Sequence, residues 1–376
     1  MTHWQFAPRH LYLHVPFCTR RCAYCDFAIA VRRFVPVDDF VRGIAGELAL
    51  RIPGAPPELD TLYLGGGTPS RLGAEGIARL LDVLRERVEL APGAEVTMEA
   101  NPEDVTERRV AAWRAAGINR LSIGAQSFDQ RVLDWMHRTH DVNAIECAVR
   151  TAREGGITNL SIDLIFSVPA ELQRDWLRDI DSALSLDPQH LSLYGLTVEP
   201  GTPLARWRAR GEAREAPEES FEQEFLAAHN RLAAAGYEHY EVSNYARPGE
   251  RSRHNSAYWA RVPYLGLGPS AHSFDGSTRW WNVAAYAEWQ RTMDLAGDPV
   301  AGREVLTEEQ SEAERTYLGL RTTHGMELAP GSLQLAQRWV GEGWASIDDG
   351  RLRLTPLGWL RLDALAAALT PVASRS

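Results

Sequence analysis

Short apolar runs that contain β-branched and aromatic residues alternate with amphipathic segments from residue 11 to about residue 200. This alternation is typical of repeated strand–helix units, which form a parallel sheet. The predicted strands are residues 11–17, 61–64, 95–100, 120–125, 160–166 and 190–196, and helical patterns between them cover residues 38–51, 74–87 and 174–186. Runs such as "SIDLIF" are almost continuously apolar, as expected when both faces of a parallel strand are covered. We therefore expect an α/β barrel or partial barrel whose site lies at the carboxyl ends of the strands.

The chain after residue 205 has a different character. Residues 206–224 are dense in charged and small residues, which predicts a solvated excursion between two ordered parts. An amphipathic helix (225–235), an aromatic-rich segment (237–289) and a tail from about Leu306 follow; the tail has two helices, a short strand pair with an Asp-Asp-Gly turn, and a last helix. We predict three domains: residues 1–205 as the partial barrel, 206–300 as its aromatic-rich continuation, and 301–376 as a small winged-helix-like module.

The charge and the composition of the chain argue against several classes of function. The 376 residues carry 40 basic and 50 acidic side chains, and the net charge of −10 argues against a general nucleic-acid binder, which needs clustered positive charge. All 40 basic residues are arginine, and the absence of lysine excludes a lysine Schiff base and a Walker phosphate loop. The apolar runs are shorter than the about 20 residues that cross a bilayer, and the first residues lack a signal-peptide core, so we expect a soluble, cytoplasmic protein.

Three of the four cysteines are clustered. Cys18, Cys22 and Cys25 lie directly after the first predicted strand in the spacing C-x3-C-x2-C, and Cys147 is distant in sequence. In a cytoplasmic protein such clustering indicates a metal site rather than disulfides. A structural zinc site normally has four protein ligands, whereas three thiolates suit an iron–sulfur cluster with one iron left open for an exchangeable ligand. A zinc site completed by a distant histidine, and cysteines without a metal, remain alternatives.

The spacing C-x3-C-x2-C, with Tyr24 before the last cysteine and at the end of the first strand of a barrel, resembles the radical S-adenosylmethionine (SAM) superfamily. The resemblance implies a partial (β/α)6 TIM-like barrel and a [4Fe-4S] cluster held by Cys18, Cys22 and Cys25. It also implies that SAM binds the open iron through its amino and carboxylate groups, and that the reduced cluster can cleave SAM to a deoxyadenosyl radical.

Further motifs at strand ends extend this resemblance. Gly65, Gly66 and Gly67 in "LYLGGGTPS" let the backbone approach a ligand, although a simple turn would also explain them. Glu99 would be costly to bury without a partner, and a helix cap or a surface charge is the alternative. The resemblance implies that SAM is contacted by Tyr12, Tyr24, Phe27, Gly66, Gly67, Thr68, Glu99, Gln126, Arg138 and Asp163. The segment "FSVPAEL" departs from the family, because Ser167, Val168 and Glu171 occupy a stretch where glycine and glutamine are more usual.

Within the superfamily, the motifs resemble the branch that contains the oxygen-independent coproporphyrinogen III dehydrogenase and the HemW-type heme chaperones. Cys25 is followed by Asp26 and Phe27, whereas the dehydrogenase has a further cysteine two positions after the third. The dehydrogenase also has a long N-terminal extension that closes over its substrate, and we expect no such lid here because only 17 residues precede Cys18. Both features favour the chaperone-type pattern.

The third distinguishing feature is the segment "RHNSAYW". In it His254, Asn255, Tyr258 and Trp259 form an H-N-x-x-Y-W arrangement that resembles the heme motif of the chaperones. A neutral imidazole can bind heme iron, and aromatic side chains offer a flat apolar face for the porphyrin. Taken without the resemblance, a histidine beside aromatics is more often a hydrogen-bonded structural residue. His272 and His239 are less specific candidates.

The leading hypothesis is a chaperone that binds heme through the His254 segment and transfers it to acceptor hemoproteins, with the cluster and SAM supporting binding, assembly or release. The alternative is an enzyme: a coproporphyrinogen III dehydrogenase, or a related radical methyltransferase or heme-degrading enzyme. No catalytic residue is assigned. The resemblance is compatible with peripheral membrane contact and with a homodimer. No nucleic-acid partner is expected, because the acidic balance favours an interaction or lid role for the winged-helix-like module.

Overall fold

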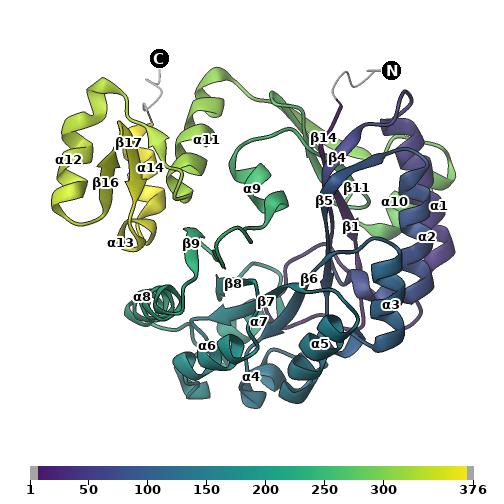
Figure 1. Cartoon of the computed structure of the whole chain (residues 1–376), viewed down its shortest axis with the longest axis horizontal. Coiled ribbons are helices and arrows are strands. Elements are labelled where there is room, and N and C mark those ends of the chain that lie inside the picture. Colours follow the sequence, from purple (N-terminus) through teal and green to yellow (C-terminus); the bar gives the residue numbers. More distant parts are fainter. Residues whose placement is uncertain (1–6, 371–376) are drawn as a thin grey trace.

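The computed structural model describes residues 7–370, so residues 1–6 and 371–376, the ends of the first and last predicted domains, lie outside the described residues. A curved nine-stranded sheet dominates the structure (Figure 1). In spatial order its strands are β11 (Leu265–Leu267), β1 (His10–Val15), β4 (Glu58–Gly66), β5 (Glu89–Ala100), β6 (Arg120–Gln126), β7 (Asn159–Phe166), β8 (His190–Gly195), β10 (Asn244–Ala246) and β9 (Glu238–Glu241). The strands from β1 to β8 pair in parallel, which confirms the six predicted strands and the α/β partial barrel.

Helices cover the convex face of this sheet (Figure 1). They are α1 (Val37–Arg51), α2 (Gly73–Arg85), α3 (Glu107–Ala115), α4 (Gln130–Trp135), α5 (Val142–Glu154) and α6 (Trp176–Ser185), with short 3-10 turns η1 (Pro69–Leu72), η2 (Pro102–Asp104) and η3 (Ala170–Leu172). In α2 the buried residues Ile77, Leu80, Leu81 and Leu84 recur at helical spacing and pack on the sheet. The three helices predicted from such patterns are confirmed, with ends that differ by one or two residues.

The opposite, concave face of the sheet is unusually polar. The strand register aligns Glu99 with Ser122, and Ser122 with Ser161. Since the side chains of neighbouring strands at one register level point to the same face, these polar groups form a row inside the partial barrel. Their apolar neighbours, such as Met98, Leu121 and Leu160, are fully buried in the main core. The sheet thus separates a hydrophobic layer beneath the helices from a polar interior.

Residues after 205 do more than continue the barrel, because they extend its sheet at both edges. Strand β11 pairs in parallel with β1, and β10 pairs antiparallel with both β8 and β9. The connecting helices are α7 (Pro203–Ala209), α8 (Glu218–Ala234) and α9 (Arg253–Trp259). The prediction that residues 206–224 form a solvated excursion is therefore only partly right, since the end of α7 and the first turns of α8 fall within it. Phe225, Ala228 and Leu232 bury one face of α8 and explain why its charged first turns are helical.

The remaining elements form three small sheets and their helices. They are a two-stranded ribbon of β2 (Phe17–Cys18) and β3 (Ala30–Val31); a sheet of β12 (His272–Phe274), β13 (Thr278–Asn282) and β14 (Val300–Val305) beside α10 (Tyr286–Asp294); and a C-terminal group of α11 (Glu308–Arg321), β15 (Met326–Glu327), η4 (Pro330–Ser332), α12 (Leu333–Gly341), β16 (Ala345–Asp348), β17 (Arg351–Leu354), α13 (Pro356–Trp359) and α14 (Leu362–Leu369). The predicted order of helices and strand pair in the tail is confirmed, with β15 as an additional strand beside β17. Among the described helices, none is both long and apolar enough to cross a membrane.

Candidate functional site

A cavity of about 430 Å³ opens at the carboxyl ends of the parallel strands. The predicted cluster and SAM residues that line it are Cys18, Cys22, Cys25, Tyr24, Phe27, Gly66, Gly67, Thr68, Glu99, Gln126, Arg138 and Asp163. Tyr12 is not among the lining residues, but its ring stacks on that of Tyr63, which is, with centroids 6.1 Å apart. The fold therefore gathers these residues, far apart in sequence, around one space.

The cysteine loop begins at the end of the ribbon strand β2 and returns to it through β3. Ala23, in the middle of the loop, donates its N–H to the carbonyl of Met136 at 3.0 Å and accepts from the N–H of Leu204 at 2.8 Å, so the loop is pinned between α4 and α7. The three thiols are free and face the cavity. Burial raises the pKa of Cys18 and raises that of Cys25 to about 11, so without a metal these thiols stay neutral.

The donor set suits an iron–sulfur cluster better than a single ion. Among the described residues, no group of three His, Cys, Asp or Glu side chains converges as required for one bound metal ion. A four-iron cluster binds each thiolate to a different iron, so three cysteines spaced around a cavity wall suffice. Binding to iron also favours the thiolate over the thiol, which offsets the cost that burial imposes on the charged sulfur.

Arg138 is fixed beside the cysteine loop. Its guanidinium donates to the carbonyl of Gly124 at 2.9 Å, to Asn101 Oδ1 at 2.8 Å and to Cys22 Sγ at 3.4 Å. Its Nε atom is buried and has no partner among the described residues. A buried cation held against a thiol stabilises negative charge on that sulfur, as a cluster ligand requires. The same cation, with an unused donor, suits an anionic group in the cavity.

Two carboxyl groups face the cavity from the polar interior of the sheet. Glu99 accepts hydrogen bonds from the hydroxyl of Tyr63 at 2.9 Å and from the N–H of Gly66 at 3.1 Å. Burial raises its pKa to about 7, against the lowering effect of these bonds. Asp163 accepts from the hydroxyls of Ser122 at 2.9 Å and Ser161 at 3.2 Å, and burial raises its pKa as well. Neither carboxyl group has a cationic partner in direct contact among residues 7–370, and both are suited to accept a hydrogen bond from a ligand N–H or hydroxyl.

The glycines of the loop after β4 are required by their surroundings. Gly66 has φ +111, and a Cβ there would lie 2.6 Å from the ring of His14. A Cβ on Gly67 would lie 2.6 Å from the backbone of Pro16. The loop therefore packs directly on the chain that leads into the cysteine loop, where only glycine fits. Gln126, which lines the cavity after β6, also has a positive φ of 68, an uncommon conformation for a residue with a side chain.

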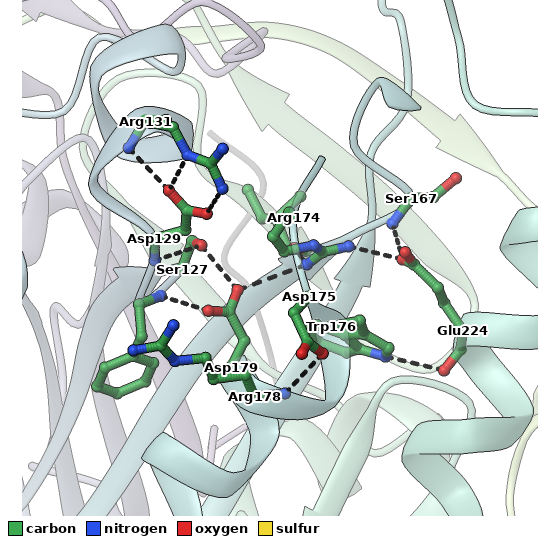
Figure 2. A network of polar contacts seen from close by, with 12 residues as sticks. Ser127, Asp129, Arg131, Ser167, Arg174, Asp175, Trp176, Arg178, Asp179 and Glu224 are labelled. Atoms are coloured by element: carbon green, nitrogen blue, oxygen red, sulfur yellow. Dashed lines mark hydrogen bonds and ion pairs between the residues drawn. The ribbon is translucent and has the colours of Figure 1, made fainter. Parts of the chain in front are cut away.

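A buried polar network supports the loops after β6 and β7 (Figure 2). Asp179 of α6 accepts from the hydroxyl of Ser127 at 2.7 Å and from the N–H of Phe128 at 2.8 Å. Arg174, with a side chain 1% exposed, donates to Glu224 at 2.7 Å and lies 3.6 Å from Asp179. Glu224 of α8 in turn accepts from the N–H of Ser167 at 2.6 Å. This network fixes both loops from behind, with Asp163 and Gln126 on the cavity side.

The candidate heme motif occupies α9, on the concave side of the sheet (Figure 1). His254 is 1% exposed, and both ring nitrogens are engaged: Nδ1 lies 2.7 Å from Thr61 Oγ1 and Nε2 lies 2.9 Å from the hydroxyl of Tyr258. Burial lowers the pKa of His254 to about 3, so the ring is neutral. In this arrangement the imidazole is a hydrogen-bonded structural residue, and heme ligation by His254 would first have to break one of these bonds.

The other motif residues lie around this buried imidazole. Trp259 lies under the guanidinium of Arg321, 4.2 Å from its ring centroid, and Asn255 is partly exposed. His254 stacks on Tyr63, with centroids 5.1 Å apart, and Tyr63 donates to Glu99. The motif therefore adjoins the cofactor cavity through a single ring. His239, a less specific candidate, is buried against Tyr245, and His272 is exposed and stacks on Trp281.

Several cavity residues were missed at the sequence level. Tyr63, Ser122 and Tyr194 line the cavity from strand positions that alternate with buried apolar residues, and His137 lines it just after α4. The signal for the strand residues was present, because a polar residue within an otherwise apolar parallel strand marks the face toward the interior. No pattern marks His137, since its place depends on how the turn after α4 folds.

Comparisons with known proteins agree with this geometry. The Radical SAM superfamily model matches residues 12–183. The chain is 39% identical over 369 residues to the heme chaperone HemW of Mycobacterium tuberculosis, covering 96% of this chain and 95% of that protein. It is 35% identical to HemW of Bacillus subtilis, with 84% of each covered. The solved coproporphyrinogen III oxidase (HemN) from Escherichia coli has the same fold, with a TM-score of 0.83, 22% identity, and coverage of 98% of this chain and 91% of that one.

The superfamily match indicates the cofactors, because radical SAM proteins contain a [4Fe-4S] cluster and SAM. The cavity offers the three sulfur donors and the polar wall that such a pair of cofactors needs. The identity to HemW proteins extends over the strands, α9 and the C-terminal elements alike. The chain belongs to the radical SAM superfamily and, within it, to the HemW family.

Proposed function

We propose that this protein is a cytoplasmic heme chaperone that binds heme and passes it to acceptor hemoproteins. The observation that carries the proposal is the 39% identity, over 96% of the chain, to a protein named heme chaperone HemW. Two local features support it. Asp26 and Phe27 follow Cys25, so the further cysteine of the dehydrogenase pattern is missing, and the H-N-x-x-Y-W arrangement stands complete in α9.

We assign the cluster to Cys18, Cys22 and Cys25, with Arg138 as the adjacent cation. When bound, a [4Fe-4S] cluster with an open iron supplies a site for SAM and, once reduced, an electron. The role of the chain's own residues is then positional. Arg138 donates a hydrogen bond to Cys22 Sγ, and the contacts of Ala23 with Met136 and Leu204 hold the loop against α4 and α7.

The SAM cradle in this proposal combines charge with close backbone approach. Ionised Glu99 accepts a hydrogen bond from the amino N–H of SAM, and the loop of Gly66 and Gly67 leaves room for the ligand next to backbone polar groups. Asp163 supplies a second hydrogen-bond acceptor in the cavity, and the rings of Tyr24 and Phe27 form apolar parts of its wall. Tyr12 acts indirectly, since it supports the ring of Tyr63 from behind.

The residues of the heme motif have a supporting role in the arrangement that the structure shows. His254, Tyr258 and Trp259 build the wall between the cofactor cavity and the C-terminal elements. A rearrangement of α9 on loading would free the imidazole and expose the rings. Before such a rearrangement, the motif stabilises the concave face of the sheet.

Heme transfer by the reconstituted protein tests the proposal. The full chain is reconstituted anaerobically with iron and sulfide, supplied with SAM, titrated with heme and mixed with a heme-free acceptor hemoprotein, with absorbance as the readout. Stoichiometric heme binding followed by transfer is expected, and a Cys18→Ser/Cys22→Ser/Cys25→Ser variant shows which step needs the cluster. Absence of heme binding would refute the proposal. Conversion of coproporphyrinogen III by the same reduced preparation, with a dehydrogenase as positive control, would establish the enzyme alternative instead.

A further inference from the structure

Arginines are concentrated around the cysteine loop. Residues 17–36 contain one acidic side chain, Asp26, and four basic ones, Arg20, Arg21, Arg32 and Arg33. The ribbon of β2 and β3 brings the two arginine pairs together, because Cys18 lies opposite Val31 and its carbonyl accepts from the N–H of Arg32 at 3.0 Å. Arg71 of η1 joins them, since its guanidinium donates to the carbonyls of Arg32 and Arg33, both at 3.3 Å. We call these five arginines the arginine surface.

The chain does not neutralise the positive charges of the arginine surface. Among residues 7–370 none of its members forms an ion pair with a carboxylate, whereas Arg79 of α2 and Asp38 of α1 do pair. Arg20, Arg32 and Arg33 are exposed. On a protein whose net charge is −10, a local concentration of positive charge attracts a negatively charged partner to this one surface and orients it there.

Exposed apolar side chains lie among these charges. Phe27, Val31 and Phe34 are 59%, 45% and 80% exposed. The guanidinium of Arg33 lies over the ring of Phe34, 5.4 Å from its centroid. Aromatic side chains and arginine are enriched in protein interfaces, and exposed apolar groups close together mark interaction sites. The combination fits a protein partner that carries acidic side chains.

The arginine surface adjoins the loop that is assigned to the iron–sulfur cluster. Arg20 and Arg21 stand between Cys18 and Cys22, and both Arg20 and Phe27 line the cofactor cavity. A partner bound to this surface therefore lies next to the cysteine loop. A [4Fe-4S] cluster is an electron-transfer centre, and its reduction needs a donor close by. Encounters between redox proteins bury little area, so a surface of this kind is sufficient for one.

We propose that the arginine surface is the docking site of an acidic electron-carrier protein that reduces the [4Fe-4S] cluster. The proposal rests on the cluster assigned to Cys18, Cys22 and Cys25, and it goes beyond heme transfer. The guanidinium groups attract and orient the acidic carrier, while Phe27 and Phe34 supply apolar contacts. The reduced carrier gives up one electron and the oxidised cluster gains it, so that no bond is made or broken.

Titration of the cluster-free full chain with carrier proteins separates docking from redox chemistry. The probes are a plant-type ferredoxin and a flavodoxin, both chosen for a net negative charge, and calorimetry measures their affinity from about 20 to about 300 mM salt. We expect the wild-type chain to bind at least one of them, and to bind it about tenfold more weakly at the higher salt concentration, because salt screens the attraction between exposed charges.

Charge variants locate the docking site. Arg32→Gln/Arg33→Gln removes two exposed charges outside the cofactor cavity and should weaken carrier binding about tenfold at low salt. Arg178→Gln/Arg338→Gln is the matched control, because it removes the same charge from exposed positions of α6 and α12, and it should change the affinity less than about twofold. Phe34→Ser should weaken binding without altering its salt dependence.

Reduction of the reconstituted protein gives a second readout. Arg32→Gln/Arg33→Gln should slow cluster reduction by the carrier about tenfold. Reduction by photoreduced 5-deazaflavin, a small reductant that needs no docking site, should proceed as in wild type. SAM binding and cluster content should also stay as in wild type, which shows that the variant is folded.

The proposal is wrong if neither carrier binds the wild-type chain, if both double variants weaken binding equally, or if a bound carrier does not reduce the cluster. It is also wrong if Arg32→Gln/Arg33→Gln loses binding to phosphatidylglycerol vesicles while carrier binding and reduction are unchanged, since the surface then contacts a membrane. If the wild-type chain takes up no cluster, the assignment to the three cysteines fails and the proposal fails with it. Heme is absent from these experiments, so failure of carrier docking and failure of heme transfer are distinguished.

Discussion

If SAM binds as proposed, the carboxyl group of Glu99 should make its binding sensitive to pH. Its pKa is raised to about 7 by burial, so it is half protonated near neutrality. An N–H donor of the ligand pairs with the ionised form, and protons therefore compete with SAM below this pKa. We expect the affinity for SAM to fall about tenfold between pH 8 and pH 6, and to level off above pH 8.

Calorimetric titration of SAM at several pH values, on cluster-loaded protein, measures this effect. Glu99→Gln should bind SAM about 10- to 100-fold more weakly at pH 8 and lose the pH dependence between pH 6 and 8. Glu199→Gln is the control, because this carboxyl lines the same cavity without a bond to Tyr63 or Gly66 and should leave the pH dependence intact. A pH dependence that persists in Glu99→Gln would show that another group titrates.

At Ser167 the backbone conformation determines how a substitution changes the stability of the protein. Its φ is +60, and it stands in the segment that departs from the glycine-containing pattern expected from the resemblance. Its N–H bond to Glu224 is retained whatever the side chain. We expect Ser167→Gly to be more stable than Ser167→Ala by about 1 kcal/mol, because only glycine relieves the left-handed strain. Urea unfolding of the two variants measures the difference, and equal stabilities would contradict this explanation.

At the scale of single residues, the sequence predicted those site residues that belong to motifs of short, fixed spacing. The cysteine triplet and the glycine loop are local motifs, and the three cysteines, Gly66 and Gly67 line the cavity, whereas Gly65 does not. Contacts between residues far apart in the sequence could not be predicted. The bond of His254 to Thr61 joins residues 193 positions apart, so the burial of its imidazole could not be predicted from the motif. His137 carries no local signal at all.

Among the elements, α9 depends on a residue of a distant strand for its first turn. Glu95 of β5 accepts from the backbone N–H groups of Arg253 and His254, each at 3.0 Å. A carboxylate at the start of a helix satisfies free donors and interacts favourably with the helix dipole. One buried side chain thus fixes the first turn of this helix to β5, in addition to the bond between His254 and Thr61.

We expect Glu95→Ala to lower the free energy of unfolding by about 2–3 kcal/mol, because two buried backbone donors lose a charged acceptor. Glu95→Gln keeps one oxygen acceptor and should lose about half of that amount. Hydrogen exchange of α9 amides, compared with that of α5 in the same molecules, localises the effect. Uniform exchange changes in both helices would argue against a local anchoring role.

The elements that sequence periodicity predicted are those with strong, uninterrupted patterns. The strands from β1 to β8 are continuous apolar runs, and α2 repeats its apolar residues at helical spacing. The edge strands β9, β10 and β11 have three or four residues each and were not predicted. Their pairing with β8 and β1 is long-range, so a short aromatic stretch gives no sign of it. The charged start of α8 was misjudged because its buried face appears only from Phe225 onward.

In the whole molecule, α9 and α11 connect the concave face to the C-terminal group of elements. The helix α9 contacts both β4 and α11 (Figure 1). Arg321, at the end of α11, pairs with Glu241 of the edge strand β9 at 2.9 Å and lies over the ring of Trp259. Glu241 is fully buried, and burial raises its pKa. One arginine therefore joins the sheet edge, the heme motif and the C-terminal elements.

Removing this arginine should destabilise the junction far more than removing an exposed one from the same helix. We expect Arg321→Ala to cost about 3–5 kcal/mol, because it leaves a buried carboxylate without its cation. Arg315→Ala, which breaks only exposed pairs with Glu308 and Glu312, should cost less than about 1 kcal/mol. The deficit of Arg321→Ala should shrink as the pH falls from 8 to 5, since the raised pKa of Glu241 makes this carboxyl easier to protonate and a protonated carboxyl needs no cation. Urea unfolding at both pH values measures this, and a deficit that does not change with pH would mean that Arg321 acts through its packing on Trp259 rather than through its charge.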